Sequence, residues 1–239
     1  MLRFRPLPVL TVATLTALAI LVALGNWQMR RLAWKEGLVA QIGARATASA
    51  RPLDEALAEG GTPADLAYTR VRATGRFDHA REAYVFTTHD GVPGFLVVTP
   101  LLREAGPPVL VERGFVPERA RAPQTRPEGQ IEGTVEVVGL LRPAERPGLF
   151  TPQPDLAARI FYAADLDAIA AAAGVAAPAP VFVAAEAGEA PGGLPQGGVT
   201  ELAPRNPHLG YALTWYGFAV VLVAVYLAYH RARGRLAWR

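Results

Sequence analysis

The chain has 239 residues, of which 51% are hydrophobic and 19% are charged, and its formal net charge is +3. It contains no cysteine, which excludes disulfides, thiolate metal sites and a cysteine nucleophile. All 21 acidic residues lie between Glu36 and Glu201. The basic excess therefore lies at the two ends of the chain, where it indicates membrane topology and gives no support to nucleic-acid binding.

Two uncharged apolar segments, Leu7–Leu24 and Leu209–Tyr229, lie near the ends of the chain. Each is close to the roughly 20 residues that a helix needs to cross a bilayer core. We predict transmembrane helices at 7–29 and 207–229. The alternative for the first is a cleaved signal peptide, because Ala23-Leu24-Gly25 resembles a cleavage site. The length of the apolar run and the helical pattern that continues beyond it favour a retained helix.

Charge at the C-terminus predicts the orientation. The tail 230–239 carries Arg231, Arg233, Arg235 and Arg239 and no acidic residue. Because positive flanks stay in the cytoplasm, and two spans place both termini on one side, residues 1–6 and the tail are expected to be cytoplasmic. The domain at 30–204 is then periplasmic.

Alternating apolar residues with Gly/Pro punctuation predict a sheet in the middle of the chain. The expected fold class is an α+β membrane protein, in which two transmembrane helices flank a mainly antiparallel, barrel-like β domain with short helices. The expected strands are 68–77, 82–88, 94–102, 109–116, 131–142, 160–163 and 180–185.

Helical spacing appears at three further places. Trp27, Arg31, Trp34 and Leu38 fall on one helical face, so the first helix is expected to continue to about Arg45. Short helices are expected at 53–57 and at 165–173. Asp165 would be the N-cap of the latter and Gly174 its stop signal.

The sequence offers little support for an enzyme. It has no GxSxG, P-loop, HExxH or CxxC motif. His79 and His89 each stand next to an aspartate in a predicted turn, and we interpret them as solvated turn residues rather than an acid–imidazole site. Four arginines remain open to two interpretations, a solvated sheet edge or a site for carboxylates of a cofactor or partner. They are Arg113, Arg119, Arg121 and Arg126.

His208 opens the second span on the side of the large domain. With Tyr211, Ala212, Trp215 and Tyr226 it is predicted to form one helical stripe. An imidazole beside apolar aromatic residues suits haem iron. The alternative, an interfacial histidine within an aromatic belt, is favoured by the residues alone.

The junction of the first span carries Trp27, Gln28, Arg31 and Trp34, for which an aromatic belt with snorkelling arginines is again the alternative. His230 lies about 33 Å from His208 by helix rise. It is therefore interpreted as a residue of the cytoplasmic flank.

Several motifs in one order resemble the Surfeit locus protein 1 family, over about Leu24 to Gly217. The N-terminal signature is similar to 24–35 (LGNWQMRRLAWK) and the C-terminal signature to 205–217 (RNPHLGYALTWYG). Between them, similar motifs stand at 75–78 (GRFD), 98–100 (VTP), 109–117 (VLVERGFVP), 130–133 (QIEG) and 191–195 (PGGLP).

The resemblance implies an assembly factor for haem-copper cytochrome c oxidase, which is not an enzyme. Such a protein would receive haem a and assist its insertion into subunit I of the oxidase. His208 would be the axial ligand of the haem iron. The other residues that would line or support the site are Trp27, Gln28, Arg31, Tyr211, Thr214 and Trp215.

The expected partners are oxidase subunit I, haem A synthase as a second candidate, and the lipid bilayer, with no nucleic acid. A second hypothesis is a scaffold that stabilises subunit I and never binds haem; an enzyme acting through the loop domain is the third. The missing cysteines and the lack of a presequence before Leu7 favour a bacterial inner membrane. Pro207 departs from the family pattern, and it disfavours helical geometry at Asn206.

Overall fold

The computed structural model describes residues 2–188, 190–200 and 206–238. It divides into two compact units, one made of residues 1–41 and 202–239 and the other of residues 42–201. The predicted end of the loop domain at 204, and Arg205 of the C-terminal motif, lie outside the described residues.

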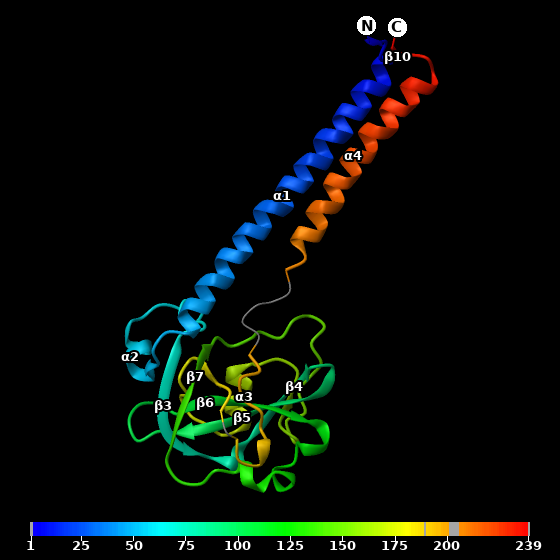
Figure 1. Ribbon diagram of the computed structural model, residues 1–239. Coiled ribbons are helices and arrows are strands. Elements are labelled where there is room, and N and C mark those ends of the chain that lie inside the picture. Colours follow the sequence, from blue (N-terminus) through cyan, green and yellow to red (C-terminus); the bar gives the residue numbers. More distant parts are fainter. Residues whose placement is uncertain (1, 189, 201–205, 239) are drawn as a thin grey trace. The chain divides into compact units, whose positions relative to one another are not determined.

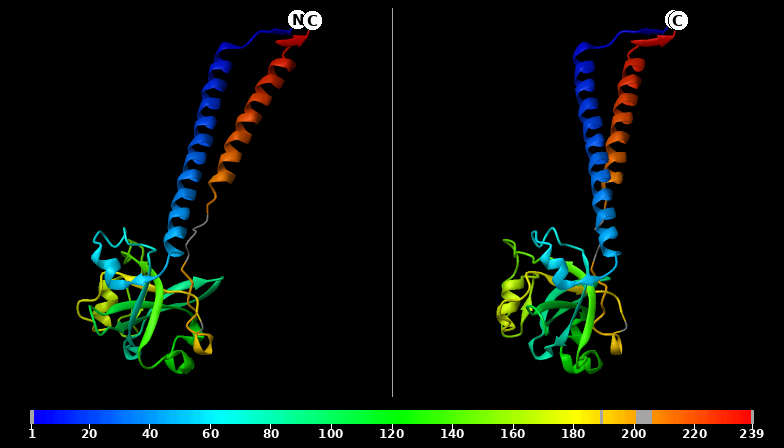
Figure 2. Two further views of the ribbon diagram at one scale, coloured as in Figure 1. Left: turned by 60° about the vertical axis from the view of Figure 1, so that its left-hand side comes forward. Right: turned by 90° about the vertical axis from the view of Figure 1, so that its left-hand side faces the viewer.

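The first unit is built around two helices, α1 (Pro8–Ala46) and α4 (His208–Ala232). They run side by side, and both chain ends lie at the same end of the pair (Figures 1 and 2). Their most apolar windows have mean hydropathies of 2.2 and 1.8, so both helices are long and apolar enough to cross a membrane. α1 runs on to Ala46, as the spacing of its aromatic residues predicted. α4 begins directly after Pro207, so Asn206 lies outside the helix, as the proline that follows it predicted.

Polar side chains join the two helices at several levels. Thr11 Oγ1 lies 2.6 Å from the hydroxyl of Tyr226, and the hydroxyl of Tyr216 donates to Asn26 Oδ1 at 2.7 Å. A Cβ at Gly25 would lie 2.5 Å from the ring of Tyr216, so only glycine lets that ring pack against α1. Small residues and interhelical hydrogen bonds of this kind are what hold apolar helices together where water is absent.

At the distal end of the pair, which is the end that carries the chain termini, β1 (Leu2–Phe4) pairs antiparallel with β10 (Leu236–Trp238). His230 is fully buried there. Its Nδ1 lies 2.9 Å from the carbonyl oxygen of Tyr226, and its Nε2 accepts from the amide of Leu7 at 3.3 Å. His230 therefore also joins the two helix ends, a contact that its interpretation as a flank residue did not include.

The second unit is an eight-stranded mixed sheet with the strand order β2-β3-β7-β9-β6-β5-β4-β8. The strands are β2 (Arg51–Pro52), β3 (Arg70–Phe77), β4 (Ala83–His89), β5 (Val92–Leu102), β6 (Val109–Pro117), β7 (Val135–Arg142), β8 (Ile160–Phe161) and β9 (Phe182–Ala185). The longer strands match the predicted ones to within a few residues. Parallel pairs occur at β2–β3, β4–β8 and β6–β9. The sheet is thus less purely antiparallel than predicted. β3 also pairs with β5, but at two positions only, so the predicted barrel is not confirmed.

Two short helices cover the sheet, α2 (Leu53–Ala58) and α3 (Leu166–Ala172). Asp165 caps α3 as predicted, because its side chain accepts from the amide of Ala168 at 3.1 Å. α2 buries Leu53 among valines of the sheet, and α3 buries Ile169 beside Phe161 and Phe182. The connections of the described part of the chain contain the short 3-10 helices η1 (His79–Arg81), η2 (Glu118–Ala120), η3 (Pro123–Thr125), η4 (Pro127–Gly129) and η5 (Pro191–Gly193).

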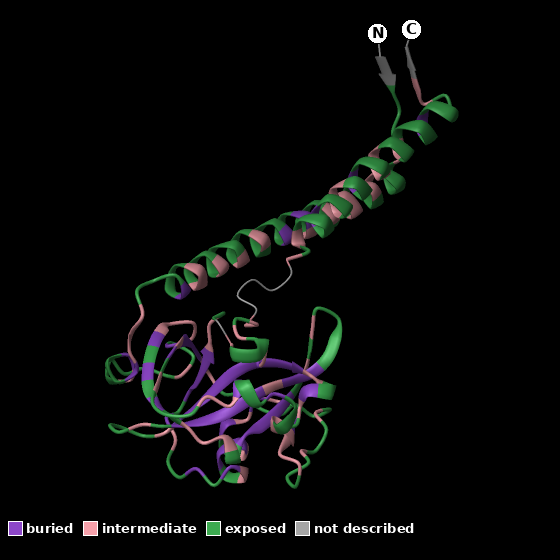
Figure 3. Ribbon diagram, turned by 60° about the horizontal axis from the view of Figure 1, so that its bottom comes forward, coloured by how far each residue is buried: buried purple, intermediate pink, exposed green. Residues whose placement is uncertain are grey.

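Burial separates the two units clearly. Buried residues gather in the strands of the second unit, whereas the helix pair exposes most of its surface (Figure 3). Large apolar side chains are exposed along both helices, for example Leu15 at 59% and Val220 at 69%. Such a surface suits a lipid environment and is unusual for a helix pair in water.

Candidate functional site

The candidate site lies where α4 begins. His208 is the first residue of α4 and is partly buried, and its Nδ1 lies 2.7 Å from Oε1 of Gln28 on α1. Gln28 itself is 8% exposed. Two predicted site residues, 180 positions apart in the chain, are therefore brought into direct contact.

This hydrogen bond selects one form of the imidazole. An amide oxygen can only accept, so Nδ1 of His208 carries the proton. In the neutral ring the second nitrogen, Nε2, then has a free lone pair. Within the described part of the chain, no hydrogen bond occupies Nε2. Metal-binding histidines are commonly held in this way, with the second ring nitrogen donating to an oxygen.

The residues predicted for the site differ in how far they are buried. Trp27 is 48% exposed and Tyr211 is 55% exposed, whereas Ala212 is fully buried. Tyr211 and Ala212, predicted on one stripe, thus differ in exposure. By helix rise, Trp27 and Tyr211 lie within one turn of Gln28 and His208, respectively. Both are large aromatic side chains with about half of their surface exposed.

Trp215 and Tyr226 lie further along α4. Trp215 is partly buried and meets Phe218 edge-on, with ring centroids 6.2 Å apart. Tyr226 contacts Thr11 and His230 near the distal end of the pair, so it does not share a site with His208. Thr214 donates to the carbonyl of Gly210 one turn earlier, which occupies its hydroxyl within its own helix.

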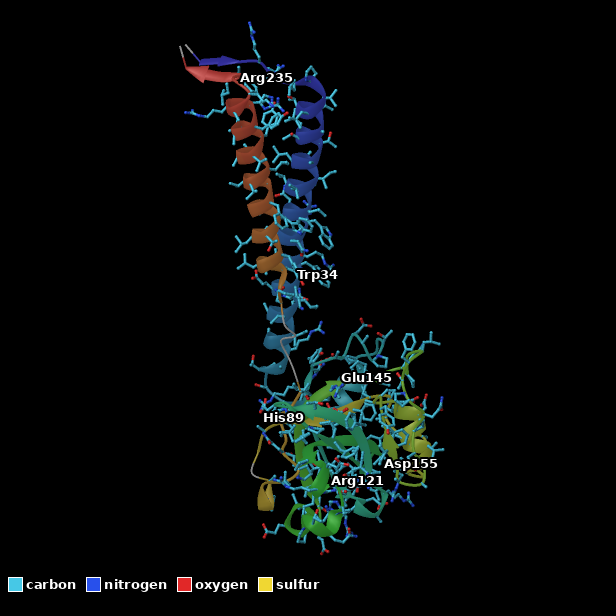
Figure 4. The ribbon with its side chains drawn as sticks, turned by 90° about the vertical axis from the view of Figure 1, so that its right-hand side faces the viewer. Trp34, His89, Arg121, Glu145, Asp155 and Arg235 are labelled. Atoms are coloured by element: carbon cyan, nitrogen blue, oxygen red, sulfur yellow. The ribbon has the colours of Figure 1, made fainter. Side chains whose placement is uncertain are left out.

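Arg31 lies on the exposed face of α1, where its guanidinium stacks over the ring of Trp34 at 4.4 Å. Trp34 projects from α1 to the outside of the helix pair (Figure 4). The predicted common face of Trp27, Arg31 and Trp34 is therefore confirmed, and it is solvent- or lipid-facing. Gln28 is buried, whereas Trp27 and Trp34 are about half exposed, so the two signature tryptophans and Gln28 have different surroundings.

A haem iron and a bare metal ion require different sets of ligands from the protein. No group of three or more His, Cys, Asp or Glu side chains that would hold a metal ion occurs among the described residues. The described residues therefore do not provide the several ligands that a bare metal ion requires. A haem iron already has four ring nitrogens and needs only an axial ligand, which one oriented imidazole supplies. The residues at His208 fit that requirement.

The four arginines predicted as a cluster separate into two pairs. Arg113 and Arg126 are buried, 7% and 4% exposed, and both bind the carboxylate of Glu82, which is 2% exposed. The solvated-edge interpretation is wrong for these two. Arg119 is exposed, and Arg121 lies over the ring of Phe95 at 5.5 Å.

Glu82 organises a buried polar network. Arg126 Nη2 donates to Glu82 Oε2 at 2.5 Å, Arg113 Nη1 lies 3.3 Å from Oε1, and Arg113 also binds the carbonyl of Gly129. His79 belongs to the same network, with Nδ1 3.5 Å from Glu82 and Nε2 2.8 Å from the carbonyl of Ile131. Its interpretation as a solvated turn residue is therefore wrong. The network joins η1 and β6 to the loop that contains η4.

Charge within the network shifts two pKa values. Burial opposes ionisation of Glu82, but hydrogen bonds from His79 and Arg126, together with both guanidinium charges, lower the pKa of Glu82 to about 2. Burial and the nearby charge of Arg126 lower the pKa of Arg113 to about 10. Both groups are charged at neutral pH, and each is already partnered. The network is thus a structural element of the domain.

Fold and site together define a class of protein. Two helices that are long and apolar enough to cross a membrane are joined by a hydrogen bond between an imidazole and an amide. The residues between these helices in the sequence fold into a mixed-sheet domain. Residues 15–220 match the family model described as "SURF1 family". The chain belongs to this family, as its motifs indicated.

Curated relatives support the same assignment. Surfeit locus protein 1 of Rattus norvegicus is 36% identical over 216 residues, which cover 81% of this chain and 67% of the relative. The protein of the same name from Takifugu rubripes is 33% identical over 222 residues, covering 86% and 90%. A SURF1-like protein of Monosiga brevicollis is 35% identical over 237 residues, covering 93% and 88%.

Sequence reasoning did not identify two contacts near the site. Asn26 binds Tyr216, and Gly25 provides the space for that ring. Both residues stand in the N-terminal motif beside Gln28. A signal was present, because an asparagine and a glutamine at the end of an apolar helix imply polar partners on another helix.

Proposed function

We propose that this protein is a membrane assembly factor of haem-copper cytochrome c oxidase, which receives haem a at His208 and assists its insertion into subunit I. The observation that carries the proposal is the hydrogen bond from His208 Nδ1 to Gln28, because it orients Nε2 as a free ligand. Membership of the SURF1 family supports the assembly role.

In this proposal the residues have separate tasks. His208 would hold the iron through Nε2, and Gln28 would fix the ring and its tautomer. Trp27 and Tyr211, each about half exposed, would contact the macrocycle. Bound haem a supplies the redox-active iron that the mature oxidase needs. A single protein ligand suits transient holding, since release breaks only one coordinate bond.

The proposal extends to location and partners. The two apolar helices would span a bacterial inner membrane, with both termini cytoplasmic and the sheet domain periplasmic. Oxidase subunit I would be the recipient, and haem A synthase is the second proposed partner. We propose that the protein is not an enzyme, since its best-oriented free ligand atom belongs to a single imidazole, that of His208.

The test is to co-express the full chain with a haem a biosynthesis pathway, purify it in detergent and record its visible spectrum. We expect a haem band in the natural protein, which is lost in His208→Ala and kept in the matched control His89→Ala. A band that survives His208→Ala would sink the ligand assignment.

The alternative function, a scaffold that never binds haem, is favoured by one observation. The exposed stripe of Trp27, Trp34 and Leu38 on α1 has no partner helix among the described residues, and it would suit docking to subunit I. A natural protein without any haem band, in cells whose oxidase fails to mature when this gene is removed, would support the scaffold.

A further inference from the structure

The sheet domain contains a cavity of 610 Å³ that the proposed function does not use. It is lined by the end of β4, by β6 and β7, and by the segment that contains Glu145 and Tyr162. Its volume lies within the range of about 300–1,000 Å³ that is typical of ligand sites. His89 and Glu145 both line it.

The cavity contains an ion-pair network with too few positive charges. Arg142 Nη1 lies 3.0 and 2.8 Å from the two oxygens of Glu112, and Arg142 Nη2 lies 2.9 Å from Glu145 Oε1. One guanidinium therefore serves two carboxylates, which leaves one negative charge. Glu112 is only 3% exposed, and burial raises its pKa although the charge and hydrogen bonds of Arg142 act in the opposite direction. Asp90 adds a further acid to the lining.

Aromatic side chains form the other walls of the cavity. Phe86 and Tyr162 are 45% and 42% exposed, and their ring centroids lie 6.0 Å apart. Phe115 meets His89 with centroids 5.3 Å apart. Aromatic faces carry negative potential and attract cations, most strongly where water is partly excluded. The half-exposed rings of Phe86 and Tyr162 are therefore suited to a cationic ligand with an apolar stem.

We propose that this cavity binds a cationic side chain, a guanidinium or an ammonium group, from a partner polypeptide. Charge complementarity selects this occupant, because acidic groups outnumber Arg142 and aromatic rings line the remaining walls. The apolar stem of an arginine or lysine would lie along Phe86 and Tyr162, and its head would approach Glu145. An anionic ligand would be repelled by the same carboxylates.

The proposal is tested with the full-length protein in detergent and the peptide acetyl-Ala-Arg-Ala-amide, followed by saturation-transfer NMR. The control peptide carries citrulline, which keeps the shape of arginine without its charge. We expect saturable binding of the arginine peptide and binding at least about tenfold weaker for citrulline. No saturable binding, or equal binding of the two peptides, would overturn the proposal.

Two variants locate the binding. Glu145→Gln and Tyr162→Ala change side chains that are 51% and 42% exposed, so the domain should keep its fold, which circular dichroism checks. Each should weaken the arginine peptide, while the exposed control Glu118→Gln should not. Undiminished binding in both cavity variants would contradict this location. Agmatine, a guanidinium without a peptide backbone, should bind more weakly than the peptide; equal binding would exclude a polypeptide as the partner.

Discussion

Polar groups are treated differently in the helix pair and in the sheet domain. In the domain, Glu82 binds Arg113, Arg126 and His79, so each buried charge of that network has a partner of opposite charge. In the helix pair, His208 uses one ring nitrogen for Gln28, and the other has no hydrogen bond within the described residues. From this difference we infer that the Glu82 network stabilises the folded domain, whereas the contact between His208 and Gln28 orients a free ligand nitrogen.

The largest expected effect is on the domain network. Glu82→Gln should destabilise the sheet domain by about 3–5 kcal/mol, because it leaves two buried guanidinium groups without their counter-charge. The four tryptophans, Trp27, Trp34, Trp215 and Trp238, lie outside the domain, so fluorescence would miss this change. Hydrogen–deuterium exchange of the β4 and β6 amides measures it directly. Exchange as slow as in the natural protein would remove the stability role of the network.

Acid should weaken the same domain over a defined range. The pKa of Glu82 is lowered from 4.5 to about 2, so the folded state favours the charged form. Its contribution is fully present above about pH 4.5 and is lost as pH falls towards 2, a total of roughly 3 kcal/mol. Hydrogen exchange between pH 5 and pH 2, corrected for the intrinsic exchange rate, would follow the loss. A corrected stability that does not change over this range would contradict the assigned pKa.

A substitution in the helix pair should change ligand binding and leave the stability of the sheet domain unchanged. Gln28→Leu should leave the stability of the sheet domain unchanged, but weaken haem binding by about 10–100-fold, because His208 loses the acceptor that fixes its tautomer. A haem titration followed by absorbance measures the affinity. Gln28→Glu, which keeps an acceptor, should recover much of the binding. Equal affinities for all three proteins would show that Gln28 does not position the imidazole.

Much of the fold could be predicted from local patterns. The apolar runs gave both long helices, and alternation gave the longer strands, because these signals depend on neighbouring residues. The parallel pairs and β2 were missed, because strand pairing depends on contacts between distant segments. His79 was misjudged for the same reason, since its partner Ile131 is 52 residues away.

The candidate site was predicted in part. Motif resemblance pointed to both His208 and Gln28, and the structure shows that the two side chains meet. The contact itself could not be read from the sequence, because 180 residues separate the pair and the packing of two helices fixes it. The exposed positions of Trp27 and Tyr211 also depend on which face of each helix packs inward.

The tautomer of His208 tests the central claim most directly. Nitrogen-15 NMR of the full chain, selectively labelled at histidine and assigned by comparison with His208→Ala, distinguishes protonated from unprotonated ring nitrogens. The hydrogen bond to Gln28 predicts that Nδ1 carries a proton, which in the neutral tautomer leaves the lone pair of Nε2 free. A ring protonated on Nε2, with Nδ1 free, would contradict the account, because the nitrogen proposed to bind iron would then carry the proton.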